Sequence, residues 1–215
     1  MRMRRKKNLD SRLEKCSHLR LKEEKVSSLS EVFGNDNPVY MEIGCGKGKF
    51  VEQIALRNPD INFIAVEMVS NVCVSAMELV EAAELKNVRF LIANAENIGE
   101  IFAEQSISRI YLNFSCPYPK RRYTKHRLTH ERFLKQYRKI LIPYGEIHLK
   151  TDKKEFFEFS LNSFCECGFT LKNICFDLHS SDFEGNIVTE YEQRFASQGL
   201  PIYRVEAVND PRLRE

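Results

Sequence analysis

The stretch from Pro38 to Phe50 constrains the fold of this chain more than any other. A short apolar run, long enough for one buried strand, leads into Gly44-x-Gly46-x-Gly48, and apolar residues then recur at helical spacing until Pro59. Three glycines between a strand and a helix allow a tight turn with positive φ angles, and they let a ligand approach the backbone closely. The stretch therefore predicts a strand–turn–helix unit with a ligand at the turn. A Gly-rich turn that serves packing alone is the alternative.

The glycine spacing and Glu42 indicate the class of ligand. Dinucleotide-binding turns carry Gly-x-Gly-x-x-Gly, whereas here the third glycine comes one residue early. Glu42 lies inside the preceding apolar strand, and a carboxylate beside a helix N-terminus repels a diphosphate but suits a cationic amine. S-adenosylmethionine carries an ammonium and a sulfonium group, so it is predicted in preference to a nicotinamide dinucleotide. Because a buried carboxylate is costly unless it is paired, an arginine from the N-terminal segment is the alternative partner.

The length and composition suit one α/β domain with a terminal extension. The chain has 215 residues, of which 43% are hydrophobic, and this is enough for a sizeable core. We expect residues 1–37 to form a basic N-terminal arm with a lead-in helix, and residues 38–215 to form the cofactor-binding domain. No apolar stretch of about 18 residues occurs and no apolar segment follows the basic N-terminus, so neither a membrane span nor a secretory signal is expected.

The cysteines indicate the compartment. Their number, seven, is odd, they are scattered along the chain, and none stands at zinc-ligand spacing with a histidine or a second pair. This pattern predicts reduced thiols in a cytoplasmic protein and no structural metal. The sequence leaves open whether the protein is a monomer or a homodimer.

Strand and helix patterns alternate from residue 38 onwards. Strands are expected at 38–44, 61–67, 88–92, 109–114, 146–150, 169–177 and 202–208. Helices are expected at 47–57, 70–85, 96–103 and 153–166, and one more carries an apolar stripe from Phe133 to Leu141 and ends at Pro143-Tyr144-Gly145. The alternation predicts an α/β fold with a mostly parallel seven-stranded sheet and helices on both faces. The last two strands lack a comparable helix between them, so they are expected to pair antiparallel at one edge.

In such a sheet the ligand lies at the carboxyl ends of the strands. Glu67 ends the second strand, 67 − 44 = 23 residues after Gly44, where an acid that binds ribose hydroxyls is expected. Asn94 follows the third strand with an amide that suits an adenine edge, and Asp152 follows the fifth. Each has a structural alternative: Glu67 as the start of the next helix, Asn94 as a turn or capping residue, and Asp152 with Glu155 as a capping box.

The positive charges are clustered, although the formal net charge is only +3. One basic run extends from Arg2 to Lys7, and another from Lys120 to Arg127. The second lies in a Pro-rich loop after the fourth strand, where Tyr118 and Tyr123 offer stacking faces and the cations can hold phosphates. Two basic runs on a nearly neutral chain indicate a polyanion such as nucleic acid. The alternatives are a solvated charged surface and, for Tyr118, packing inside the loop.

The loop also carries the most specific motif of the chain. Asn113-Phe114-Ser115-Cys116-Pro117-Tyr118-Pro119-Lys120, followed by cations and Arg127-Leu128, resembles the Asn-Phe-Ser-Asp-Pro-Trp-Pro-Lys signature of the tRNA (guanine-N7-)-methyltransferase family. The resemblance covers residues from about 38 to 208 and includes Met41-Glu42-Ile43-Gly44, Thr151-Asp152 and Thr189-Glu190-Tyr191-Glu192-x-Arg194-Phe195. It implies a Rossmann-like class I methyltransferase that transfers a methyl group from S-adenosylmethionine to N7 of a guanine in the variable loop of tRNA.

The resemblance also implies roles for individual residues. Cofactor contacts are expected, together with the glycine turn, at Glu42, Gly44, Gly46, Gly48, Glu67, Asn94 and Cys116. Substrate or RNA contacts are expected at Lys120, Arg122, Tyr123, Thr124, Lys125, His126, Arg127, Asp152, Thr189, Glu190, Tyr191 and Glu192. Asn94 stands where the family usually has Asp, and Tyr118 where it has Trp. Cys116 replaces the Asp that is usually considered catalytic.

The chemistry at N7 tolerates the loss of that carboxylate. Guanine N7 carries an in-plane lone pair and no hydrogen, so its methylation needs no general base. The enzyme must hold N7 in line with the methyl–sulfonium bond, and an acid near the base can accept hydrogen bonds from guanine N1–H and the N2 amine. We expect a working enzyme in which Asp152, Glu190 or Glu192 takes part of this role. A non-catalytic RNA-binding protein of the same fold is the alternative, and a methyltransferase for proteins or small molecules is a third.

Overall fold

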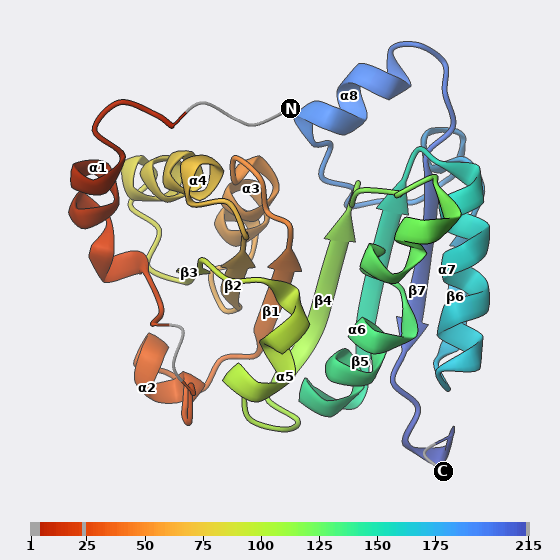
Figure 1. The fold of residues 1–215 in the computed structure, drawn as a ribbon, viewed down its shortest axis with the longest axis horizontal. Coiled ribbons are helices and arrows are strands. Elements are labelled where there is room, and N and C mark those ends of the chain that lie inside the picture. Colours follow the sequence, from red (N-terminus) through yellow and green to blue (C-terminus); the bar gives the residue numbers. More distant parts are fainter. Residues whose placement is uncertain (1–4, 23–24, 214–215) are drawn as a thin grey trace.

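A computed structural model describes residues 5–22 and 25–213, without the side chain of Glu190. Seven strands form one sheet in the order β3-β2-β1-β4-β5-β7-β6 (Figure 1). They are β1 (Val39–Ile43), β2 (Asn62–Val66), β3 (Val88–Leu91), β4 (Ile107–Asn113), β5 (Leu141–Thr151), β6 (Thr170–Cys175) and β7 (Tyr203–Val208). Strands β1 to β5 pair in parallel, and β7 runs antiparallel between β5 and β6. The expected mostly parallel sheet with an antiparallel edge is confirmed.

Helices cover both faces of the sheet, as expected. They are α1 (Leu9–Lys15), α2 (Leu29–Phe33), α3 (Lys49–Arg57), α4 (Ser70–Ala82), α5 (Ile98–Ile101), α6 (Glu131–Ile140), α7 (Lys154–Glu166) and α8 (Glu190–Ala196). One buried apolar cluster joins the sheet to α5, α6 and α7, and a second joins the opposite face to α3 and α4. Helix α8 lies above the carboxyl ends of the parallel strands (Figure 1).

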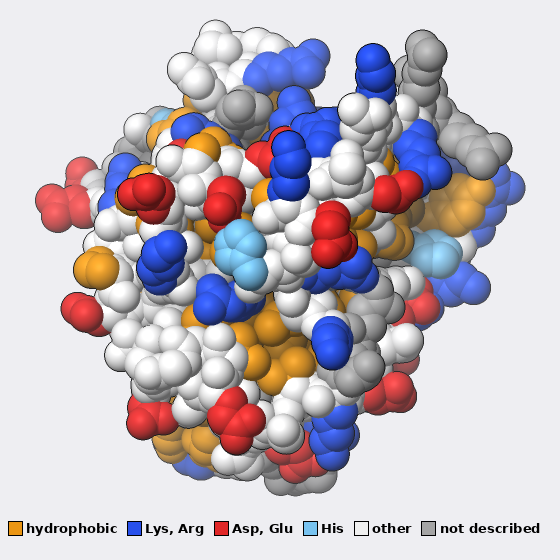
Figure 2. Space-filling model, turned by 90° about the vertical axis from the view of Figure 1, so that its left-hand side faces the viewer, with side chains coloured by type: hydrophobic (Ala, Val, Ile, Leu, Met, Phe, Trp, Pro, Cys, Tyr) orange, Lys and Arg blue, Asp and Glu red, His pale blue; other side chains and the backbone are white. Residues whose placement is uncertain are grey.

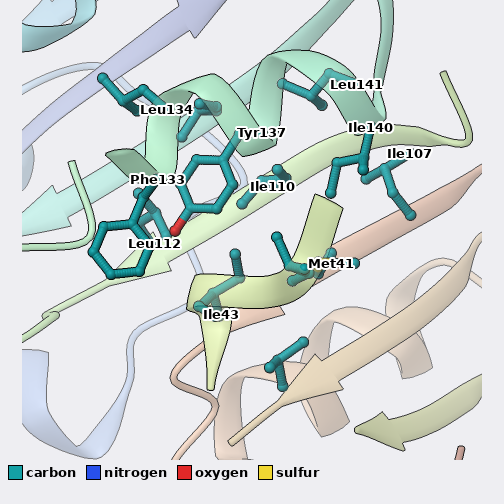
Figure 3. Close-up of a cluster of buried hydrophobic side chains, with 14 of the residues drawn as sticks. Met41, Ile43, Ile107, Ile110, Leu112, Phe133, Leu134, Tyr137, Ile140 and Leu141 are labelled. Atoms are coloured by element: carbon teal, nitrogen blue, oxygen red, sulfur yellow. The ribbon is translucent and has the colours of Figure 1, made fainter. Parts of the chain in front are cut away.

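Alternation along the strands sends neighbouring side chains to opposite faces. Met41 and Ile43 of β1 belong to the cluster beneath α6, so Glu42 between them points to the other face. Phe133 and Tyr137 of α6 point toward the strands beneath, with Tyr137 completely buried (Figure 3). Burying one such large side chain stabilises the fold by about 1.5–3 kcal/mol. The apolar face of β1 therefore anchors the strand, and it leaves Glu42 on the face that carries the second cluster.

The helix with the apolar stripe from Phe133 to Leu141 was expected to end at Pro143-Tyr144-Gly145, and this prediction is wrong. Helix α6 ends at Ile140, and the three residues belong to β5. Their backbone pairs with the chain beyond β7, because Tyr144 N–H donates to the carbonyl of Asn209 and Asn209 N–H donates to that of Gly145. The β4–β5 pairing is irregular at this point, where its register shifts between the pairs Ile107–Leu141 and Arg109–Glu146.

The N-terminal segment is more ordered than its composition suggests. Helix α1 packs on α4 through an ion pair between Arg12 and Glu78 (2.5 Å), and Leu9, Cys16 and Leu19 are buried. The apolar residues of α1 span only two turns, which is too short a repeat to indicate a helix. Arg2 and Arg4 of the predicted basic arm lie outside the described residues, and a domain boundary at residue 37 stays a prediction. Across the part of the chain that the structure describes, no helix combines the length and apolarity needed to cross a membrane.

Replacing Gly48 by alanine is expected to destabilise the fold by about 3 kcal/mol or more, since backbone strain and overpacking add. Gly48 has φ +82°, and an added Cβ would lie 2.5 Å from Cβ and 2.8 Å from Cα of Ala76 in α4. Gly34→Ala is the matched control, because Gly34 has φ +72° with no neighbour within 4 Å, and it is expected to cost about 1–2 kcal/mol. Urea unfolding measures both. Equal losses would contradict a close α3–α4 contact at Gly48.

Candidate active site

The glycine turn after β1 opens on a cleft. Gly44 and Gly46 have φ angles of +84° and +56°, and a Cβ at either position would meet no atom within 4 Å. Both line a cavity of about 260 Å³, together with Glu42, Thr189 and Tyr191. Gly48 instead faces α4. Two of the three glycines therefore leave space for a ligand, and the third serves helix packing.

Glu42 is the unusual charge of this cleft. It is only 4% exposed, and its Oε1 accepts a hydrogen bond from Asn113 Nδ2 at 3.1 Å. Its Oε2 is buried and has no hydrogen-bond partner among the described residues. Burial raises the pKa of Glu42 to about 7, although the Asn113 hydrogen bond and the Lys150 charge act in the opposite direction.

The alternative partner for Glu42, an arginine of the N-terminal segment, is not seen among the described residues. Arg5 pairs with Asp10, and Arg12 pairs with Glu78 on α4. A buried carboxylate oxygen without a partner is the feature that a cationic ligand group would satisfy.

Glu67 ties the glycine turn to the next strand. Its Oε2 accepts a hydrogen bond from Gly46 N–H (3.1 Å) and its Oε1 one from Val69 N–H (3.0 Å). Asn94 caps the short helix at Ala95–Asn97, where its Oδ1 accepts from Glu96 N–H (3.1 Å). Asn94 thus has the capping role that its alternative supposed, whereas Glu67 does not start the next helix, because α4 begins at Ser70. Both also line a second cavity, so a contact with a ligand stays a prediction.

The two cavities form one cleft along the carboxyl ends of the strands. The second cavity has a volume of about 300 Å³ and shares Gly44, Asn113 and Phe114 with the first. Cys116 and Tyr118 of the Pro-rich loop also line it. A ligand lying in the cleft would therefore pass from Glu42 across the glycine turn toward Glu67 and Asn94.

Within the Pro-rich loop, the side chains divide into two groups. Arg127 holds the loop in place, since its guanidinium donates to the carbonyls of Pro117 (2.9 Å) and Tyr118 (3.2 Å) and stacks over Phe159. His126 lies beside Tyr118, with 5.6 Å between ring centroids, so packing of Tyr118 is present. A second group is exposed to solvent: Lys120, Arg121, Arg122, Tyr123 and Lys125. Thr124 is half-buried and donates to the carbonyl of Arg121.

Thr189 and Tyr191, at the start of α8, complete the upper wall of the cleft, and Asp152 after β5 is not part of the lining of either cavity. The side chain of Asp152 is 4% exposed and lies 2.6 Å from the Lys153 ammonium group. Thr189 caps α8, because its Oγ1 accepts from Glu192 N–H (3.0 Å). The Tyr191 ring lies 5.2 Å from that of Phe114. Glu192 is completely buried and pairs with Lys150, so the structure gives it a role besides its predicted contact with the substrate.

Comparison with known proteins decides the family. The sequence model of a family described as "Putative methyltransferase" matches residues 36–205. A tRNA (guanine-N(7)-)-methyltransferase of Bacillus licheniformis is 48% identical over 96% of this chain and 98% of the relative, and one of Brevibacillus brevis is 52% identical over 82% and 83%. The chain belongs to the tRNA (guanine-N7-)-methyltransferase family.

Solved structures support the fold. The 16S rRNA methyltransferase KamB superposes with a TM-score of 0.64 at 15% identity, over 88% of this chain and 96% of that chain. A precorrin-6y C5,15-methyltransferase from Geobacter metallireducens gives a TM-score of 0.56 at 14% identity, over 95% and 94%. At these identities the likeness concerns the fold alone, and it confirms the class I methyltransferase architecture.

Three features of this family member were not predicted from its sequence. The Asn113 amide that holds Glu42 was recognised only as part of a motif, and Lys150 only as part of a strand end. Helix α8 was also missed, although Thr189-x-x-Glu192 matches the Ser/Thr-x-x-Glu pattern of a helix start. That pattern was the available signal.

Among the described residues, one group with metal-ligating atoms occurs, in a neighbouring cavity that shares Phe50 and Asn113 with the first. Ligand atoms of Glu146, His148 and Glu206 lie within 4.8 Å of one another. Cations already occupy this group, since Arg109 pairs with Glu146 at 2.8 Å and Lys172 bridges both carboxylates. The expected absence of a structural metal stays a prediction.

Replacing Glu42 by glutamine is expected to stabilise the ligand-free protein at pH 8. The pKa of Glu42 is raised from 4.5 to about 7, so wild type loses stability as the pH rises from 4.5 through 7, by at most about 3 kcal/mol. Glutamine carries no such penalty. The free energy of unfolding of Glu42→Gln should exceed that of wild type by about 1–3 kcal/mol at pH 8 and match it below pH 4.5.

Urea unfolding at pH 4 and pH 8 tests this expectation. Glu131→Gln, at an exposed carboxylate of α6, controls for the loss of one charge far from the cleft. If the free energies of unfolding of Glu42→Gln and wild type differed by the same amount at both pH values, titration of Glu42 would not be the cause of the difference.

Proposed function

We propose that this protein transfers the methyl group of S-adenosylmethionine to N7 of a guanine in tRNA. The observation that carries the proposal is the buried Oε2 of Glu42, which has no hydrogen-bond partner within residues 5–22 and 25–213 and lies in a cleft bordered by a Pro-rich loop with exposed cations. The Bacillus licheniformis relative named tRNA (guanine-N(7)-)-methyltransferase matches 96% of this chain, so the matched part includes both the cleft and the loop. The variable loop of tRNA is the expected target region.

The residues of the cleft fit S-adenosylmethionine. Glu42 would accept the methionine ammonium group, and the open backbone at Gly44 and Gly46 would lie against the methionine portion. The Glu67 carboxylate keeps free lone pairs for the ribose hydroxyls, and Asn94 borders the place for the adenine. When bound, this cofactor supplies an electrophilic methyl group on its sulfonium.

The role of the protein in the reaction is to position the guanine base. N7 has a free lone pair and gains a positive charge, so no side chain has to remove a proton. Thr189 and Tyr191 border the cleft, where they would orient the base, and Asp152, which follows β5 outside the lining of the two cavities, would assist them. Alignment of this kind lowers the activation barrier by several kcal/mol.

Exposed cations would hold the tRNA phosphates. Lys120, Arg122 and Lys125 lie on the loop beside the cleft and are exposed. Lys and Arg side chains also gather toward the top of the face that carries α1, which is the end of the molecule where the parallel strands finish (Figure 2). All seven cysteines are free, which supports the further proposal that the protein acts in the reducing cytoplasm.

Cys116 favours a second candidate function, a non-catalytic RNA-binding protein. The residue is exposed and stands in the cleft where the family usually has Asp. Burial raises the pKa of Tyr118, and the neighbouring Cys116 adds to this effect. A thiol accepts hydrogen bonds from guanine poorly. If the protein transferred no methyl group, Cys116 would be the residue responsible.

Incubation with unmodified tRNA and labelled S-adenosylmethionine is expected to yield N7-methylguanosine on nucleoside analysis. Cys116→Asp is the comparison variant, and its turnover should lie within about tenfold of wild type if positioning dominates. Binding of cofactor and tRNA without any product would instead favour the non-catalytic RNA binder. A gain of several orders of magnitude in the variant would show that the natural protein is impaired.

Removing loop cations is expected to weaken tRNA binding and its salt dependence together. Lys120→Ala and Arg122→Ala should each lower the slope of log K against log salt by about 1, because one phosphate fewer is neutralised. Lys135→Ala, at a 72% exposed cation of α6, is the matched control and should leave the slope unchanged. A flat salt dependence in wild type would favour a protein or small-molecule substrate.

A further inference from the structure

Helix α8 has an unusual anchor. It spans seven residues, and helices of this length are unstable alone in water. A surface helix is normally held by an apolar stripe, but among the described side chains of α8 Glu192 alone is buried, with no exposed surface, whereas Tyr191 is 46% exposed. The position of α8 therefore depends on what pairs with this buried carboxylate.

That partner is Lys150 at the end of β5. Its Nζ lies 2.7 Å from Glu192 Oε2 and also donates to Asn186 Oδ1 (3.0 Å) and to the carbonyl of Ile187 (2.9 Å). All three donors of the ammonium group are thus used, and Lys150 is 6% exposed.

The other oxygen of Glu192 is occupied as well. Its Oε1 accepts a hydrogen bond from Asn186 Nδ2 (2.6 Å) and lies 3.2 Å from His179 Nε2. Both ends of the pair are satisfied, which is the condition under which a buried ion pair holds a unique arrangement.

The pair holds residues of the cleft without lining the cleft itself. Thr189 and Tyr191 lie on either side of the start of α8 and border the cavity that contains Glu42, whereas neither Lys150 nor Glu192 borders it. The Tyr191 ring also packs against Phe114, which follows Asn113. A change at the buried pair would thus reach Thr189 and Tyr191 through α8, while the Lys150 charge also acts directly on Glu42.

We propose that Lys150 is a positioning residue whose buried pair with Glu192 holds α8, and with it Thr189 and Tyr191, over the base-binding part of the cleft. The inference rests on the proposed function for its effect on methyl transfer. It assigns Glu192 to this pair, in place of a direct contact with guanine, because both carboxylate oxygens are engaged.

The experiment compares Lys150→Met with the double variant Lys150→Met/Glu192→Met. In the single variant Glu192 is left buried without its partner, so amide hydrogen exchange in residues 190–196 should become about tenfold faster or more. The kcat/KM for tRNA should fall about 100-fold, since displacement by about 1 Å can cost that much. Both variants lack the Lys150 charge that acts on Glu42, so any direct effect on S-adenosylmethionine binding is common to the two, and a native circular dichroism spectrum reports that each variant is folded.

The double variant provides the rescue. Replacing both charges by apolar residues of similar volume is often neutral, so α8 protection should return and kcat/KM should recover to within about tenfold of wild type. Lys172→Met is the matched control, because Lys172 pairs with Glu146 and Glu206 on the same sheet, away from α8. If Lys150→Met does not fold, Lys150→Gln, which keeps a hydrogen-bond donor, replaces it.

Two results would overturn the inference. Unchanged exchange of α8 in the single variant would show that the pair does not position the helix. Restored α8 protection without restored transfer in the double variant would show that one of the two charges acts on the substrate or on the cofactor site directly, and not by positioning α8. If wild type transferred no methyl group to tRNA, the proposed function would fail, yet the exchange measurements would still decide whether the pair holds α8.

Discussion

The hydrogen bond from Asn113 to Glu42 joins the ends of two neighbouring parallel strands. It supports one oxygen of a carboxylate that the sheet has removed from water, and the other oxygen has no partner among the described residues. The raised pKa of Glu42, about 7, reflects this incomplete compensation. The cleft is therefore built around the Glu42 carboxylate, which destabilises the fold until a cation binds to it. This unfavourable burial makes the cleft selective for a positively charged ligand.

The period of two along the strands makes this arrangement possible. In β1, Met41 and Ile43 enter the apolar cluster beneath α6, while Glu42 points to the other face. In β5, Ile147 and Leu149 enter the same cluster, whereas Lys150 contacts Glu192 above the sheet. In these two strands the face toward α6 is apolar, whereas the other face carries the charges of the cleft beside the second apolar cluster. A shift of one residue in either strand would exchange the two roles.

Local patterns predicted the parts of the fold that depend on neighbouring residues in sequence. The strand–turn–helix unit at Gly44 to Gly48, the alternation of an α/β sheet and the polar residues at the strand ends all carry short-range signals. The helix end at Pro143 failed because the start of β5 depends on pairing with Asn209, which is distant in sequence. The roles of Lys150 and Asn113 were not predicted for the same reason, since each residue gains its role from a partner on an element that is distant in sequence. Helix α8 has no apolar repeat that would indicate it, because its buried residue is a charged one.

The basic loop shows why composition alone does not separate binding from structure. Arg127 and Lys120 belong to the same run of cations, yet Arg127 uses its donors on the backbone of the loop, and Lys120 is exposed. Arginine suits the internal role because its planar guanidinium can bond two carbonyls and still stack on Phe159. A loop held in this way keeps Cys116 and Tyr118 at the cleft. Since attack by N7 requires alignment and no proton transfer, a rigid loop can contribute to catalysis even where the residue at its tip carries no carboxylate.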